Sequence, residues 1–221
     1  GGRILGEGMP KYLNSPETPL FKKGQTLFAL DAAREAAGQQ HTLIIVEGYF
    51  DAVALHQAGI RHVAATLGTA LTAEHITVIR RFASNVVLLF DPDQAGVRAA
   101  LRTLDLFVNS GLSVKVVSLP EGDDPDTYVR KYGAEGFTAL HEAAPSLLDF
   151  AVEHSLRTAE SGTVEDRIRA VDAVLRILQK SAHPIEREER IRLVAERLGL
   201  SQQRLIDRYP TLASEETRRP S

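Results

Sequence analysis

The stretch that decides the fold is Val86-Val87-Leu88-Leu89-Phe90-Asp91-Pro92-Asp93-Gln94-Ala95-Gly96. Its first half is an unbroken apolar run, which is typical of a strand buried on both faces of a parallel sheet. Two carboxylates, Asp91 and Asp93, follow at the end of the strand, where a helix is predicted to begin. This is the edge at which α/β sheets bind ligands. A second such run, Leu43-Ile44-Ile45-Val46, leads into Glu47-Gly48-Tyr49-Phe50-Asp51. If the two strands are neighbours, their acidic ends face each other across a small gap.

Strand and helix patterns alternate around these two runs. Strands are predicted over residues 42–46, 62–66, 85–90 and 112–118, and helices over 26–37, 51–58, 73–83, 94–109 and 127–133. Strict alternation implies right-handed crossovers and a mostly parallel sheet flanked by helices on both faces. The strand signal then disappears, and helices are predicted over 134–159, 163–180, 184–198 and 202–209. The sequence therefore predicts an α/β fold followed by an all-helical subdomain.

The length, composition and net charge of the chain exclude several classes of protein. With 221 residues, 43% hydrophobic and 25% charged, the chain can form one good core and a smaller second unit. A net charge of -3 means that any nucleic-acid contact must come from a local basic patch. The absence of cysteine excludes disulfides and cysteine-ligated zinc. No apolar run approaches the roughly 20 residues of a membrane span. The chain begins at Gly1 and is expected to be a fragment of a longer protein.

Carboxylates at the predicted strand ends form the candidate site. Six of them lie at strand ends or in the adjoining loop: Glu47, Asp51, Asp91, Asp93, Asp124 and Asp126. Brought together without cations, they would repel one another. Mg²⁺ or Mn²⁺ resolves that conflict, because hard cations take oxygen ligands, and two ions about 4 Å apart suit phosphoryl transfer. The alternative is that acids such as Asp51 and Asp93 only cap the helices that follow.

The N-terminal segment carries the opposite charge. Arg3, Lys11, Lys22 and Lys23 are interleaved with Tyr12 and Phe21, a mixture that suits a phosphate backbone and stacked bases. The alternative is ordinary solvated surface. The arginines of the C-terminal half alternate with glutamates at helical spacing and are interpreted as exposed salt-bridged faces.

These residues resemble a known family. Residues 47–51 followed by 91–96 are similar to the signature of the Toprim domain, which is shared by bacterial primases, topoisomerases, certain nucleases and RecR-type recombination proteins. Within that group the chain resembles the bacterial DnaG-type primases. Residues 10–18 with 21–24 resemble the primase motif upstream of Toprim, and residues 124–133 resemble the one downstream. The similarity extends from Gly2 to about Tyr209.

The resemblance implies a DNA-directed RNA polymerase that makes short RNA primers on single-stranded DNA by metal-dependent nucleotidyl transfer. The resemblance implies that Glu47, Asp91 and Asp93 are the catalytic, metal-binding acids. It also implies that Asp51, Asp124 and Asp126 complete the acidic cluster. The residues implied in nucleic-acid and nucleotide binding are Arg3, Lys11, Tyr12 and Lys23. The implied cofactor is Mg²⁺, for which Mn²⁺ substitutes, with zinc only in a module outside this fragment. The implied partners are template DNA, nucleoside triphosphates, the RNA primer–DNA hybrid and, through a domain absent here, the replicative helicase, in the bacterial cytoplasm.

The resemblance also implies a domain plan. Residues 1–40 are expected to end the N-terminal polymerase subdomain, 41–133 to form Toprim, 134–209 to form a helical subdomain and 210–221 to be linker. The chain departs from the primase pattern at Pro92, where glycine is common between the two aspartates. Proline leaves both carboxylates in place, so a small effect on geometry is expected.

Two alternatives remain open at this point. One is another Toprim enzyme, a topoisomerase or a nuclease, although Ala95 stands where topoisomerases usually carry a third acid. The other is a non-catalytic DNA-binding scaffold of the recombination-mediator type. A simple receiver-like domain with acids at its strand ends is disfavoured, because a receiver would carry a lysine after its last core strand and this chain has Pro-Glu-Gly at residues 120–122.

Overall fold

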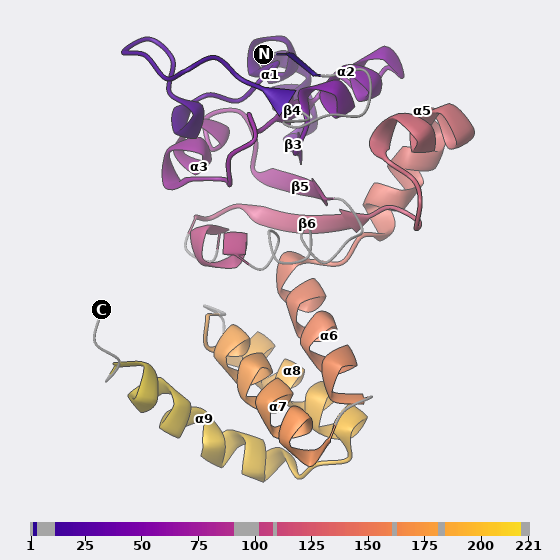
Figure 1. The fold of residues 1–221 in the computed structure, drawn as a ribbon. Coiled ribbons are helices and arrows are strands. Elements are labelled where there is room, and N and C mark those ends of the chain that lie inside the picture. The colour runs from indigo at the N-terminus through magenta and orange to yellow at the C-terminus, as the bar shows by residue number, and fades with distance from the viewer. Residues whose placement is uncertain are drawn as a thin grey trace. The chain divides into compact units, whose positions relative to one another are not determined.

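The computed structural model describes residues 2–3, 12–90, 102–107, 110–160, 163–180 and 184–217 (Figure 1). The chain divides into two compact units, Gly1–Ser146 and Leu147–Ser221. Among the described residues, every helix is too short or too polar to span a bilayer.

The first unit is built on a four-stranded parallel sheet with the order β4-β3-β5-β6 (Figure 1). Its strands are β3 (Thr42–Val46), β4 (Val63–Ala65), β5 (Asn85–Phe90) and β6 (Ser113–Ser118). The predicted strands 42–46 and 85–90 are therefore confirmed, and the other two are shorter than predicted. The predicted α/β class is confirmed too. The predicted helix 94–109 lies partly outside the described residues, of which 102–107 are helical.

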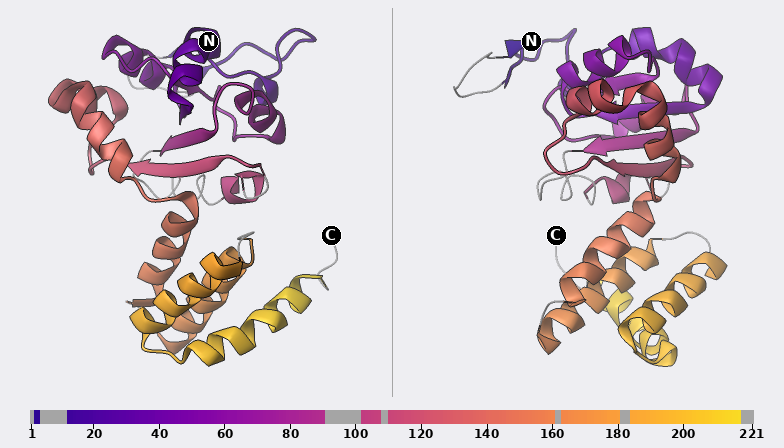
Figure 2. Two further views of the ribbon diagram at one scale, coloured as in Figure 1. Left: turned by 180° about the vertical axis from the view of Figure 1, so that it is seen from behind. Right: turned by 90° about the vertical axis from the view of Figure 1, so that its right-hand side faces the viewer.

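Helices cover both faces of the sheet. On one face, Ile44 and Val46 of β3 and Val87 and Leu89 of β5 share a core with α2 (Tyr49–Gln57) and α5 (Pro125–Ala143). The alternate residues of the strands point to the opposite face, where α1 (Leu30–Gln40) lies against β3 and β4. The helix α3 (Ala73–Ile79) follows β4. This burial on both faces explains the continuous apolar runs. The views in Figure 2 show the sheet between these helices.

Each edge of the sheet is closed by a short bridge. At the β4 edge, Phe28 and Ala65 exchange backbone hydrogen bonds of 2.8 and 3.1 Å. At the β6 edge, the Val116 N–H donates to the Pro145 carbonyl at 3.0 Å, and Lys115 is bridged to Ser146. The segments before and after the sheet therefore lie along its two outer strands.

The helix α5 is interrupted at Gly133, whose backbone angles are φ 68° and ψ −175°. The predicted domain boundary falls at this break, but the chain beyond it still belongs to the first unit. Phe137, only 1% exposed, packs into the same core as β3 and β5. The predicted helix 134–159 is also divided, because Ala144 is extended and Pro145 bonds to β6. Proline disfavours a helical conformation in the residue before it, which explains the break.

The second unit is all-helical, as predicted. It contains α6 (Leu147–Glu160), α7 (Val164–Gln179), α8 (Pro184–Leu198) and α9 (Gln202–Thr217). Its core includes Val174, Leu175 and Leu178, each fully buried. The predicted helix 202–209 continues to Thr217, so most of the predicted linker 210–221 is helical. Good helix formers such as Leu212 and Ala213 follow Pro210 and support this extension.

Candidate metal and nucleotide site

The two acidic strand ends are neighbours in the sheet. Strands β3 and β5 pair in parallel with Val46 opposite Leu89. Glu47 follows Val46 directly, and Asp91 is the next residue in sequence after Phe90, the last residue of β5. The predicted adjacency of the two strands is confirmed. Asp91 and Asp93 themselves lie outside the described residues.

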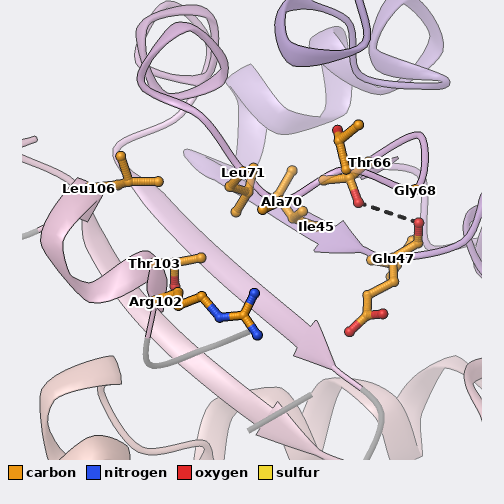
Figure 3. A pocket seen from close by; sticks show the side chains of 11 residues that line it. Ile45, Glu47, Thr66, Gly68, Ala70, Leu71, Arg102, Thr103 and Leu106 are labelled. Carbon is orange, nitrogen blue, oxygen red and sulfur yellow. Dashed lines mark hydrogen bonds between the residues drawn. The ribbon is translucent and has the colours of Figure 1, made fainter. Parts of the chain in front are cut away.

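Glu47 lines a pocket of about 290 Å³ at this edge (Figure 3). Its backbone carbonyl accepts a hydrogen bond of 3.4 Å from the Thr66 hydroxyl, and the Thr66 N–H donates to the Val46 carbonyl at 3.0 Å. These bonds join the loop after β4 to the end of β3. The other lining residues are Ile45, Val46, Gly68, Thr69, Ala70, Leu71, Arg102, Thr103 and Leu106.

Asp51 lies in the first turn of α2, where its carboxylate accepts a 3.2 Å hydrogen bond from the Gly48 N–H. This is the capping role that the sequence left open as the alternative to metal binding. A carboxylate has two oxygens and several lone pairs, so the cap and a metal contact are compatible. Asp51 follows Glu47 by four residues, across the short turn between β3 and α2.

The downstream acids are organised by α5. Asp124 is its N-cap and accepts a 2.8 Å hydrogen bond from the Thr127 N–H. Asp126 forms an ion pair with Arg130, with a 2.9 Å separation. Among the residues that the structure describes, which omit 91–101, no three acidic or histidine side chains are gathered closely enough to hold a metal.

Sequence reasoning missed the buried acid of this loop. Asp123, 7% exposed, pairs through its carboxylate with the ammonium of Lys131. This carboxylate hydrogen bond raises the pKa of Lys131. The pair ties the 120–126 loop to α5 about two turns beyond the N-cap Asp124. The charged run at 121–126 gave no signal for which of its acids is buried.

The N-terminal segment runs to the same edge of the sheet. Strands β1 (Gly2–Arg3) and β2 (Tyr12–Leu13) pair antiparallel, so the backbones of Arg3 and Tyr12, two of the predicted nucleic-acid-binding residues, lie opposite each other. The Asn14 amide donates a 2.8 Å hydrogen bond to the Leu67 carbonyl, in the loop that lines the pocket. Lys11 lies outside the described residues.

His75 anchors the part of this segment that carries Lys23. It is fully buried. Its Nδ1 accepts from the Thr72 N–H at 3.3 Å, and its Nε2 lies 2.9 Å from the Lys23 carbonyl and 3.2 Å from that of Thr26. These partners fit a neutral ring protonated on Nε2, and burial lowers its pKa accordingly. No pattern in the sequence separates this histidine from the other six.

Family models match three parts of the chain. Residues 44–129 match a model described as Toprim-like, and residues 1–34 match the N-terminal domain of the DNA primase catalytic core. Residues 148–203 match the DnaB-helicase binding domain of primase. The prediction that the helicase-binding domain is absent from this chain was therefore wrong. The ion pairs and the apolar core of the described helices in this part of the chain do not by themselves identify a partner.

Relatives and solved structures agree with these matches. A DNA primase of Clostridium acetobutylicum is 40% identical over 212 residues, covering 96% of this chain and 35% of the relative. That of Escherichia coli K12 is 40% identical over 183 residues, covering 81% and 32%. A solved DnaG catalytic core is 37% identical with a TM-score of 0.75, covering 93% of this chain and 67% of that one. A DnaG catalytic domain bound to single-stranded DNA is 39% identical with a TM-score of 0.72, covering 85% and 61%.

A Toprim-type sheet with acids at its carboxyl edge defines the class of protein, and the chain belongs to the bacterial DnaG-type DNA primase family. It spans about a third of the length of the curated relatives that it matches.

Proposed function

We propose that this chain carries the catalytic acids of a bacterial DNA primase, which synthesises short RNA primers on single-stranded DNA. The observation that carries the proposal is the parallel pairing of β3 with β5, since it brings the strand that ends at Glu47 beside the strand that precedes Asp91. The family supports the reaction, in which a ribose 3′-hydroxyl attacks the α-phosphate of a nucleoside triphosphate and pyrophosphate leaves.

We propose Glu47, Asp91 and Asp93 as the catalytic and metal-binding residues, with Asp51, Asp124 and Asp126 completing the set. An all-carboxylate donor set suits Mg²⁺, or Mn²⁺ in its place. When bound, the cation supplies Lewis-acid stabilisation of the phosphate charge. The capping bonds of Asp51 and Asp124 fix these carboxylates in direction, which favours a preorganised site. Glu47 either shares the cation or accepts the proton of the attacking hydroxyl.

We assign template and nucleotide binding to Arg3, Lys11, Tyr12 and Lys23. The anchoring of this segment by Asn14 and His75 to the loop and helix after β4 supports the assignment, because it ties the described part of the segment to the edge that bears Glu47. The partners would be template DNA, nucleoside triphosphates and the primer–template hybrid. The helicase-binding match over residues 148–203 supports the replicative helicase as a further partner, at the replication fork in the bacterial cytoplasm.

For the domain plan, we propose that residues 1–40 end the N-terminal polymerase subdomain and that Toprim begins at residue 41. The helical subdomain would follow. It would span residues 134–209, with a linker over residues 210–221; the second compact unit begins within it, at Leu147.

A non-catalytic DNA-binding scaffold is the second candidate. The observation that favours it is that Asp51, Asp124 and Asp126 each have a structural partner in the described part of the chain. Such a scaffold would bind DNA through the basic segment without using a metal.

Mn²⁺ titration calorimetry separates the two candidates. The wild-type chain should bind Mn²⁺, and an Asp91→Asn, Asp93→Asn variant should lose that binding. Glu135→Gln, which neutralises an exposed acid on α5, is the matched control and should bind like the wild type. Equal weak binding by all three proteins would contradict a metal-dependent polymerase site and favour the scaffold.

A further inference from the structure

The loop between β6 and α5 holds an ion pair in which neither partner is a proposed metal ligand. The carboxylate of Asp123 is paired with the ammonium of Lys131, on α5. Asp123 is buried, whereas the side chain of Lys131 is 55% exposed. An ionised carboxylate is almost never buried unless it is paired, so Lys131 is the partner that allows Asp123 to stay in the interior as an anion.

The loop that carries Asp123 begins at the carboxyl edge of the sheet. Strand β6 pairs in parallel with β5, so the loop after β6 starts beside the strand that precedes Asp91. Figure 1 shows this loop leading from β6 to α5. The loop turns at Gly122, whose φ of +86° favours glycine, and the Asp123 N–H donates to the Pro120 carbonyl at 3.1 Å. The turn therefore fixes the backbone on one side of the buried carboxylate.

Burial alternates along the residues that lead into α5. Asp123 and Pro125 are buried, whereas Asp124 is exposed and Asp126 is partly exposed. Asp124 has an extended backbone, with φ −102° and ψ 172°, and consecutive side chains of an extended chain point to opposite sides. Burial of the Asp123 carboxylate therefore turns the Asp124 carboxylate outward, where it caps α5 by accepting from the Thr127 N–H at 2.8 Å.

Lys131 lies on the same helix, about two turns beyond the cap. Its ion pair with Asp123 therefore spans the first two turns of α5, and these turns are held to the core of the sheet by the buried Tyr128. Helix ends open more readily than helix centres unless such contacts hold them. The turn that the pair holds closed is the one that carries Asp124 and Asp126.

We infer that Asp123 and Lys131 are positioning residues, whose ion pair holds two of the proposed metal ligands in a single orientation. Those ligands are Asp124 and Asp126, at the start of the helix that the pair closes. The inference rests on the proposed primase function and deepens it, because it adds two residues that contact neither metal nor substrate. Groups that orient metal ligands in this way raise the metal affinity, and their loss typically weakens it about 10- to 100-fold.

The test is Mn²⁺ titration calorimetry on the full 221-residue chain and its Lys131→Met variant. If Lys131 acted only through its charge, removing a positive charge near the acids would strengthen Mn²⁺ binding. Loss of a positioning pair has the opposite sign, so Lys131→Met should weaken Mn²⁺ binding about 10-fold. Lys131→Arg can keep the ion pair and should restore most of the affinity.

Arg130→Met is the matched control. Arg130 precedes Lys131 on α5, and its side chain is 76% exposed in an ion pair with the partly exposed Asp126. Removing this surface cation should not weaken Mn²⁺ binding. The double variant Asp123→Asn, Lys131→Met keeps the net charge of the wild type and leaves no unpaired buried carboxylate. It should still bind Mn²⁺ about 10-fold more weakly than the wild type, because the contact that holds the turn is gone. Urea unfolding of each variant checks that it is folded.

The same titrations separate this inference from the proposed function. Mn²⁺ affinity that is unchanged or higher in Lys131→Met, or equally weakened in Arg130→Met, would overturn the positioning role. The metal site would stand in either case, provided that wild-type binding depends on Asp91 and Asp93. Wild-type binding that survives Asp91→Asn, Asp93→Asn unchanged would instead overturn the proposed function, and the inference with it.

Discussion

His62 should make the first unit sensitive to acid. Its side chain is 8% exposed, and its Nδ1 has no hydrogen-bond partner among the described residues. Burial first, and then the charges of His141 and His56, lower the pKa of His62 from 6.5 to about 4. The folded unit therefore holds this imidazole neutral at a pH where the unfolded chain has already taken up a proton.

The sign and size of the effect follow from that difference. As pH falls from 6.5 to about 4, the unfolded state binds the proton and the folded state does not, so stability declines across this window. Each pKa unit is worth 1.36 kcal/mol, which gives a total of about 3 kcal/mol. Between pH 7 and pH 4.5 the loss should be about 2 kcal/mol.

The assay is urea unfolding at pH 7 and pH 4.5, read by peptide-resolved hydrogen exchange so that the first unit is followed separately. His62→Gln cannot be protonated, so its loss of stability between the two pH values should be smaller than that of the wild type by about 2 kcal/mol. The other histidines are present in both proteins and largely cancel in this comparison. Identical pH dependence in the two proteins would refute the reasoning.

Three further substitutions test the packing. Gly133→Ala forces alanine into φ 68°, ψ −175°, and should cost about 1 to 3 kcal/mol in urea unfolding, whereas a cost near zero would mean that α5 is not interrupted there. His75→Ala removes the partner of the Lys23 and Thr26 carbonyls, so amide exchange of residues 23–26 should accelerate while that of α5 stays unchanged. Leu175→Ala leaves a cavity in the helical core and should cost the second unit about 2 to 5 kcal/mol in thermal or urea unfolding; a smaller loss would contradict the burial of Leu175.

The sequence predicted most of the sheet because the signal is physical and local. Strands buried on both faces need continuous apolar residues, so 42–46 and 85–90 were readable to the residue. Whether β3 and β5 are neighbours in the sheet could only be assumed from the sequence, since the order of strands depends on long-range packing. The domain boundary at residues 133–134 stays a prediction, and no local pattern shows that Phe137, beyond it, packs into the core of the sheet.

The sequence predicted which acidic residues belong to the candidate site, but it predicted fewer of the contacts that these residues make. The acids at the strand ends were found from their position in the sequence, but their capping bonds and the buried pair of Asp123 with Lys131 were not. Asn14 and His75 were missed because each acts through backbone carbonyls that are more than 45 residues away in sequence, as the separations of 53 and 52 residues show. Such contacts leave no periodic pattern.

The bridges at the two edges of the sheet have a consequence for solubility. An outer strand with unpaired N–H and C=O groups is a template on which a second chain can assemble. Here Phe28 occupies part of the outer side of β4, and Pro145 with Ser146 occupies part of the outer side of β6. Proline itself cannot donate a hydrogen bond to an incoming strand. The segments that connect the sheet to the rest of the molecule thus also hinder edge-to-edge aggregation, because they cover part of each outer strand.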